Sequence, residues 1–314
     1  MHPTGIVLLN LGGPATQDEV RPFLMNIFHD REIIKLGPAF LQPLIAQFIV
    51  SSRLLEVKTR YAAIGGGSPL LRETLAQAEA LARTLAEAGH PMEVRPLFRH
   101  SPPRARTVLM DLAGLGIRRI LPVSLYPHAC RATLGSSLRE LRREATLHEL
   151  EVLPGVQSYA TDPGYLDALE AQLLNALSQA PGATVLFSAH SLPLKQIRNG
   201  DPYEREIHAT VEALKARLGE LPGGFRLAYQ SKVGPVAWLG PSLESVLREL
   251  KGREVIVLPL SFVSEHIETL FELDIEYQQI AEKAGVTRFL RVPTLGADPT
   301  YIGALARLAR QALL

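Results

Sequence analysis

Cysteine is almost absent from this sequence: Cys130 is the only one among 314 residues. A single cysteine excludes an internal disulfide, and it excludes a zinc or iron–sulfur site built on several cysteines of this chain. It is typical of a reducing compartment, so we expect a cytoplasmic protein. A lone thiol can be a nucleophile, but a small buried residue is its more common role.

Long apolar runs and an excess of charge of one sign are absent too. No run of about 18 apolar residues occurs, so no membrane-spanning helix is expected, and a strand that begins by Gly5 leaves no room for a signal peptide. The formal net charge is +1 and no basic patch carries interleaved aromatic residues, so nucleic acid is not an expected partner. The composition, 46% hydrophobic and 21% charged, is typical of a soluble globular protein, and the length allows two domains.

The common cofactor motifs are missing as well. The sequence contains no Walker loop, no G-x-G-x-x-G, no H-E-x-x-H and no G-x-S-x-G. No nucleotide cofactor is therefore expected. Gly12-Gly13 follows the first strand and could cradle a phosphate, but with Pro14 the pair more often makes a tight turn.

Short β-rich runs alternate with longer helical patterns along the chain. This alternation predicts an α/β fold with parallel sheets and right-handed crossovers. The pattern restarts after Pro163, which predicts two similar domains with a ligand cleft between them. We place the first domain at residues 1–158, completed by a C-terminal helix at 296–314, and the second at 159–295. The expected strands are 5–11, 92–98, 117–126, 184–188, 225–229 and 254–262, and the expected helices are 72–89, 165–178, 202–218, 241–251 and 298–314.

An acidic segment follows the last of these strands. On an α-helix advancing about 100° per residue, Glu265, Glu268, Glu272 and Glu276 form a stripe roughly 80° wide. Like charges four residues apart destabilise a helix by about 0.2–0.5 kcal/mol per pair, and no Lys or Arg within the segment balances them. Carboxylates beside His266, just past the carboxyl end of a strand, suit the capture of a divalent cation. The alternative is a solvated helix face.

One apolar stretch, residues 40–57, does not fit a plain α/β plan. It begins Phe40-Leu-Gln-Pro-Leu-Ile-Ala-Gln-Phe-Ile-Val50 and continues through Leu54, Leu55 and Val57. It predicts either a buried helix or an exposed apolar rim that admits a hydrophobic ligand or contacts a membrane surface.

Several longer motifs occur together, in an order that resembles the ferrochelatases. The resemblance extends from about residue 5 to 312, and the mitochondrial and proteobacterial type is the most similar. It implies two Rossmann-like domains enclosing a porphyrin cleft, and the insertion of Fe²⁺ into protoporphyrin IX for haem synthesis. The motifs are Leu8-Leu-Asn-Leu-Gly-Gly-Pro14, Tyr61-Ala-Ala-Ile-Gly-Gly-Gly-Ser-Pro69, Tyr126-Pro127 with Gly135-Ser-Ser137, Phe187-Ser-Ala-His-Ser-Leu-Pro193, Tyr229–Pro241 and the acidic segment.

The resemblance also implies roles for single residues. His190 would accept a pyrrole proton or bind iron briefly, with Glu268 as its acidic partner and Glu272 and Glu276 as outer steps of a path for protons and cations. Fe²⁺ is then a substrate rather than a resident cofactor. The residues implied in porphyrin binding are Leu11, Arg53, Tyr61, Ser68, Arg99, Lys232 and Trp238.

Two departures from the family pattern limit what is carried over. Leu11 stands where several Gram-positive relatives have a tyrosine able to ligate iron. Arg131 stands where some cluster-bearing relatives place a cysteine, and their cysteine-rich tail is missing, so no [2Fe–2S] cluster is expected. Because porphyrin and haem are poorly soluble, we also expect peripheral membrane contact through residues 40–57.

The identity of the substrate stays open. Coproporphyrin III, a tetracarboxylate, would undergo the same chemistry but needs more cationic partners than the sequence locates. A porphyrin or haem carrier without turnover is a further alternative, although a carrier has no use for a cation path. A chelatase that loads another metal, such as cobalt into a corrin precursor, is a third.

Overall fold

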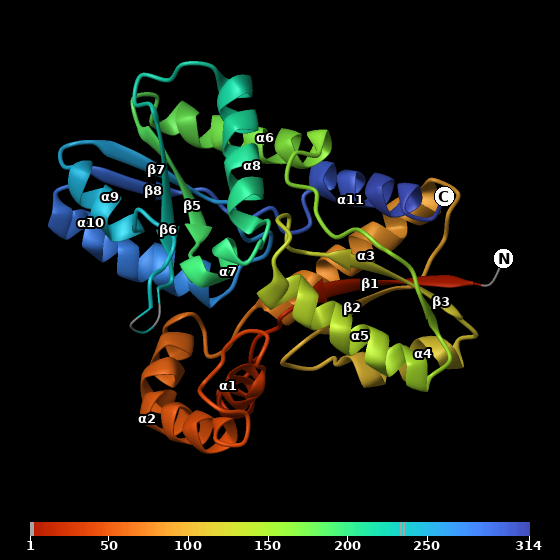
Figure 1. Cartoon of the computed structure of the whole chain (residues 1–314). Coiled ribbons are helices and arrows are strands. Elements are labelled where there is room, and N and C mark those ends of the chain that lie inside the picture. The colour runs from red at the N-terminus through yellow and green to blue at the C-terminus, as the bar shows by residue number, and fades with distance from the viewer. Residues whose placement is uncertain (1–2, 233, 235) are drawn as a thin grey trace. The chain divides into compact units, whose positions relative to one another are not determined.

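The computed structural model describes residues 3–232, 234 and 236–314, and they form two compact units. Unit 1 is made of the chain up to Tyr126, of Cys130–Ser158 and of Leu305–Leu314. Unit 2 is made of Pro127–Ala129 and Tyr159–Ala304. Each unit has one four-stranded sheet in which every strand pair is parallel (Figure 1). The predicted α/β fold with two parallel sheets is confirmed.

The sheet of unit 1 has the strand order β2-β1-β3-β4. Its central strand, Ile6-Val-Leu-Leu, is buried on both faces, as expected for a parallel sheet covered by helices. β4 was not predicted, because two residues are too few to show a pattern. The strands are β1 (Thr4–Asn10), β2 (Val94–Phe98), β3 (Arg119–Ser124) and β4 (Glu151–Val152).

The helices of unit 1 include several that the apolar spacing did not predict. The last helix of the chain, α11 (Pro299–Gln311), begins in unit 2 and ends in unit 1. The other helices are α1 (Val20–His29), α2 (Gln42–Ala63), α3 (Leu70–Glu87), α4 (Ala105–Gly114), the π-helix η1 (Arg131–Gly135) and α5 (Ser136–Leu147).

Helix α2 and the residues before it decide between the two interpretations of residues 40–57. Phe40, Leu44, Phe48 and Leu55 are 78%, 71%, 76% and 79% exposed. The segment is therefore a helix with an apolar outer face, and a fully buried helix is wrong. Among the described residues, no helix combines the length and the apolar character needed to cross a bilayer.

The sheet of unit 2 has the strand order β6-β5-β7-β8. β8 was not predicted because an arginine stands at each end of its four residues. The strands are β5 (Thr184–His190), β6 (Phe225–Gln230), β7 (Glu254–Pro259) and β8 (Arg288–Arg291). The helices are α6 (Pro163–Gln179), α7 (Leu194–Arg198), α8 (Tyr203–Leu218), α9 (Leu243–Glu249), the π-helix η2 (Glu268–Tyr277) and α10 (Gln278–Ala284).

The acidic segment forms a π-helix instead of the predicted α-helix. Residues up to His266 are irregular, and the π-helix η2 begins at Glu268. A π-helix bonds i to i+5, so its turn is wider, and a spacing of four residues falls slightly short of one turn instead of slightly beyond it. Glu268, Glu272 and Glu276 thus still follow one side, whereas Glu265 lies outside the helix.

Candidate functional site

The functional residues of unit 2 gather at the carboxyl edge of its sheet. β5 ends at His190, β6 at Gln230, and β8 at Arg291, while β7 leads into the loop before η2. Because the four strands are parallel, these ends meet along one edge, which is where open α/β sheets bind their ligands.

The backbone of His190 is held on both sides. Its N–H donates to Ser261 Oγ at 2.9 Å, and its carbonyl accepts from the Tyr203 hydroxyl at 2.9 Å. The two hydroxyls lie 2.6 Å apart and complete the bracket. Strand β5 and the hydrogen bonds from Ser261 and Tyr203 therefore fix the backbone position from which the imidazole projects.

The imidazole of His190 has one nitrogen committed and one available. Nδ1 lies 2.6 Å from the carbonyl oxygen of Ser191, which can only accept, so Nδ1 carries the hydrogen. In the neutral ring Nε2 is then the acceptor. It lies 3.8 Å from Oε2 of Glu268.

A second imidazole, that of His266, faces the same carboxylate oxygen. Its Nδ1 lies 3.0 Å from the carbonyl of Ser264 and its Nε2 lies 3.7 Å from Oε2 of Glu268. The ring of Phe262 packs edge-on against both imidazoles, with centroids 4.3 Å from His266 and 6.3 Å from His190. Two acceptor nitrogens and one anionic oxygen therefore converge on one point, an arrangement that calls for a proton or a cation.

Glu268 supplies that oxygen. Oε2 is shielded from solvent and accepts no hydrogen bond from any residue that the structure describes. Burial raises the pKa of this carboxyl, but the positive charges that His190 and His266 can carry outweigh burial and hold the pKa below its ordinary value. Glu268 is thus an anion whose natural counter-charge is a protonated imidazole.

Glu272 lies one step further along η2 and is held by β6. Its Oε2 accepts from the Ser231 hydroxyl at 2.5 Å and from Nε2 of Gln230 at 3.2 Å. Burial and then the charge of Glu268 raise its pKa to about 7; the two hydrogen bonds oppose the shift and the charge of Glu276 adds to it. Glu272 can therefore exchange a proton at neutral pH.

Glu265 does not lie beside Glu268, Glu272 and Glu276. We expected no basic residue to balance the acidic segment, but Glu265 does have a basic partner. Nη1 of Arg291 donates to Glu265 at 2.6 Å, while the rest of the guanidinium holds Asp274. The counter-charge was missed because it comes from β8, 26 residues further along the chain.

No closed metal cage is found here. Among residues 3–232, 234 and 236–314, no group of three or more His, Cys, Asp or Glu side chains is arranged to hold a metal ion. Nε2 of His190 and Nε2 of His266 lie 3.8 and 3.7 Å from Oε2 of Glu268, so a proton or a cation that enters between them meets two nitrogens and one carboxylate oxygen.

In unit 1, the glycine-containing loops predicted to bind porphyrin pack against each other. The Ser68 N–H donates to the carbonyl of Pro14 at 2.7 Å, and a Cβ on Gly67 would stand 2.1 Å from the carbonyl oxygen of Ala15. Only glycine allows this approach. Of the other predicted contacts in unit 1, the Leu11 N–H donates to the Tyr126 hydroxyl at 3.1 Å, and Tyr61 is buried at the end of α2.

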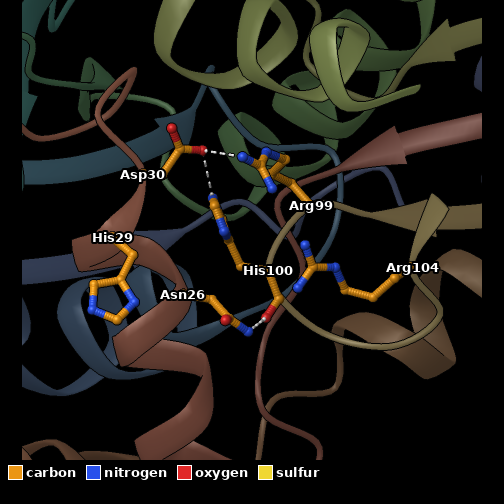
Figure 2. A pocket seen from close by; sticks show the side chains of 6 residues that line it. All are labelled: Asn26, His29, Asp30, Arg99, His100 and Arg104. Atoms are coloured by element: carbon orange, nitrogen blue, oxygen red, sulfur yellow. Dashed lines mark hydrogen bonds and ion pairs between the residues drawn. The ribbon is translucent and has the colours of Figure 1, made fainter. Parts of the chain in front are cut away.

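Arg99 is committed to side chains of its own unit. It contacts Asp30 at 2.9 Å, Glu140 at 3.1 Å and Ser136 at 2.8 Å, so all three nitrogens of the guanidinium are engaged. Figure 2 shows Arg99 and His100 converging on Asp30. These side chains border a hollow of about 180 Å³. Burial and the charge of Arg99 lower the pKa of His100 to about 3, so this ring is neutral. The hollow is lined by Asn26, His29, Asp30, Arg99, His100 and Arg104.

The remaining predicted porphyrin contacts are less constrained. Arg53 lies on the outer part of α2, 3.9 Å from Glu56. Lys232 is exposed, and its neighbours Val233 and Pro235, within the predicted motif, lie outside the described residues. Trp238 Nε1 is buried, with no hydrogen-bond partner among the residues that the structure describes. The roles of these residues stay predictions.

Several residues of the site were not predicted. Gln230 and Ser231 stand directly before Lys232 in a quoted motif, so the signal was available there. Tyr203 follows Asp201-Pro202, a turn signal that does not single out the tyrosine. Arg291 gave no signal beyond its place at the end of a short strand.

Comparison with known proteins identifies the family. Residues 3–313 match the ferrochelatase family. A ferrochelatase of Synechococcus sp. (strain JA-3-3Ab) is 42% identical, with 100% of this chain and 95% of the relative covered. A ferrochelatase of Geotalea daltonii is 43% identical, with 98% of this chain and 97% of the relative covered.

Solved structures agree with the fold. SirB from Bacillus subtilis with Fe³⁺ has a TM-score of 0.58 at 16% identity, covering 77% of this chain and 89% of that one. CbiX, the terminal enzyme for biosynthesis of siroheme in denitrifying bacteria, has a TM-score of 0.52 at 19% identity, covering 78% and 93%. At these identities the likeness concerns the two-domain Rossmann-like fold alone. From its sequence relatives, the chain belongs to the ferrochelatase family, the porphyrin metal chelatases of haem synthesis.

Proposed function

We propose that this chain inserts Fe²⁺ into protoporphyrin IX, forming protohaem and releasing two protons. One observation carries the proposal: Nε2 of His190 and Oε2 of Glu268 face each other at 3.8 Å, at the carboxyl edge of the unit 2 sheet. Membership of the ferrochelatase family supports porphyrin as the partner of this pair.

The reaction needs an acceptor for protons. Two pyrrole N–H bonds break as four nitrogen–iron bonds form, and the charge of Fe²⁺ is balanced by the two departing protons. His190 accepts a pyrrole proton at Nε2, since its Nδ1 hydrogen is bound to the carbonyl of Ser191. The imidazolium that results is stabilised by the anionic Glu268 beside it.

The outer carboxylates carry the proton away. With a pKa of about 7, Glu272 accepts and releases protons under neutral conditions, and Glu276 follows one step along η2. The same carboxylates attract a divalent cation in the opposite direction. Proton release and iron supply thereby share one path, with His190 as the base rather than as a lasting iron ligand.

The test is metallation by the purified chain. Metal-free porphyrin with Fe²⁺ under anaerobic conditions, or with Zn²⁺, reports turnover through its absorption bands. We expect multiple turnovers; porphyrin binding without metallation would favour a carrier instead. Steady-state rates on protoporphyrin IX and coproporphyrin III decide the substrate, and a clear preference for the tetracarboxylate would overturn our choice. Failure on both porphyrins, with cobalt insertion into a corrin precursor, would indicate the third alternative.

We further propose that the protein is cytoplasmic and that the outer face of α2, together with the residues just before it, contacts the surface of a membrane. Phe40, Leu44, Phe48 and Leu55 are all more than two thirds exposed, and the porphyrin and its product partition into lipid. Co-sedimentation with liposomes tests the contact. Binding to lipid is the expected outcome, whereas dimerisation without any lipid binding would assign this face to a second copy of the chain.

A further inference from the structure

Oε2 of Glu268 is not held in place by a short hydrogen bond. It has no such partner in the described part of the chain, and the two imidazole nitrogens that face it lie 3.8 and 3.7 Å away. What is held is the backbone, because the Glu268 carbonyl accepts from Nε2 of Gln230 at 3.0 Å. The position of the oxygen opposite His190 therefore depends on how η2 begins.

One guanidinium spans the beginning of η2. Arg291 stands at the end of β8, and its side chain is only 12% exposed. Nε and Nη2 donate to the two oxygens of Asp274 at 2.7 and 2.6 Å, and Nη1 donates to Glu265 at 2.6 Å. Glu265 lies three residues before Glu268 and Asp274 six residues after it, so Arg291 ties together the chain on either side of the carboxylate.

Hydrogen bonds also link Glu265 to His266, the second histidine that faces Glu268. The other oxygen of Glu265 accepts from the Thr269 hydroxyl at 2.6 Å, and Thr269 Oγ1 accepts the His266 N–H at 3.1 Å. Fixing Glu265 therefore fixes the backbone of His266, whose ring faces Glu268.

We propose that Arg291 is a positioning residue for metal insertion: its fork, shared between Glu265 and Asp274, sets the place of Glu268 opposite His190. The inference rests on the proposed roles of His190 and Glu268. The mostly buried Arg291 side chain does not touch Oε2 of Glu268 and acts through the backbone of η2. A lysine supplies one point charge on a flexible stem, so it can hold one of the two carboxylates but not both in register.

The variants Arg291→Lys and Asp274→Asn test this, with Arg288→Lys as the matched control. Arg288 stands at the other end of β8 and is exposed, with its Nη1 bonded to a backbone carbonyl. Asp274→Asn keeps the pair between Arg291 and Glu265, so it decides the question alone if Arg291→Lys fails to fold. Each protein is assayed for Zn²⁺ insertion into protoporphyrin, porphyrin affinity and thermal midpoint.

We expect kcat to fall at least about tenfold in both variants, since displacement of a reacting group by about 1 Å can cost on the order of a hundredfold. Porphyrin affinity and KM stay within about twofold, because neither Arg291 nor Asp274 is among the residues predicted to bind the porphyrin. In Arg291→Ala, added guanidinium ion restores part of kcat and ammonium does not. Arg288→Lys behaves as the unaltered chain.

Two kinds of failure are distinguishable. If the unaltered chain does not metallate porphyrin, the proposed function falls and the inference with it. If the unaltered chain turns over while both variants keep its kcat, only the positioning role is refuted. A fall in rate that is matched by an equal loss of porphyrin affinity or of folded protein refutes it too, because a merely structural residue would give that pattern.

Discussion

The elevated pKa of Glu272 makes a quantitative prediction for Glu272→Gln. Burial and the neighbouring charge of Glu268 raise this pKa from 4.5 to about 7. Below about pH 4.5 the carboxyl is protonated in both the folded and the unfolded chain, so it does not reduce the free energy of unfolding. As pH rises toward 7 the unfolded chain releases the proton while the folded chain keeps it, so the folded state loses stability until both are ionised.

The size of the effect follows from the same values. The pKa of Glu272 differs by about 2.5 units between the unfolded and the folded chain. At about 1.4 kcal/mol per unit, the folded state loses about 3 kcal/mol of stability in full. A neutral glutamine accepts the same hydrogen bonds from Ser231 and Gln230 without carrying the charge. Glu272→Gln should therefore raise the free energy of unfolding by up to about 3 kcal/mol near pH 8, and change it little near pH 4.5.

The assay is urea unfolding followed by tryptophan fluorescence across that pH range. Trp238 is the only tryptophan and lies in unit 2, so the signal reports on the unit that contains the substitution. Glu249→Gln, on the exposed side of α9, is the control for the substitution itself. A gain for Glu272→Gln that is the same at all pH values, or no gain at all, would refute the reasoning.

Other predictions follow from the same contacts. Ser231→Ala removes a hydrogen bond that lowers the pKa of Glu272, so the pH at which metallation reaches half its maximum should move upward; a downward shift would contradict this. Tyr203→Phe removes the hydroxyl that holds the backbone of His190, and kcat should fall while porphyrin KM stays within about twofold. Replacing Leu44 and Phe48 together by serine should reduce liposome binding but leave turnover of detergent-dispersed porphyrin intact; unchanged liposome binding would argue against the proposed lipid contact.

The sequence predicted the fold well where apolar runs are long. The strands that end at His190 and at Pro259 are continuous buried runs, and parallel sheets favour such runs. β8 was missed because a strand of four residues with arginines at both ends lacks that signal. The π-helix η2 could not be predicted, since the same spacing of glutamates fits an α-helix and tertiary contacts decide between the two.

The site was predictable only in part. His190 and Glu268, singled out by family resemblance, lie together in unit 2. No spacing rule could reveal that Arg291, on a strand later in the chain, binds Glu265. The partners of Arg99 were not predictable either. Its role in porphyrin binding stays a prediction, and it is engaged by Asp30 and Glu140, since sequence alone does not show which acidic side chains will surround an arginine.

The most direct test is the metallation rate of His190→Ala and Glu268→Gln, measured beside their affinity for metal-free porphyrin. Our account predicts that each substitution abolishes metal insertion while porphyrin still binds with nearly unaltered affinity. Normal turnover in either variant would contradict the roles assigned to the imidazole and the carboxylate that face each other at 3.8 Å.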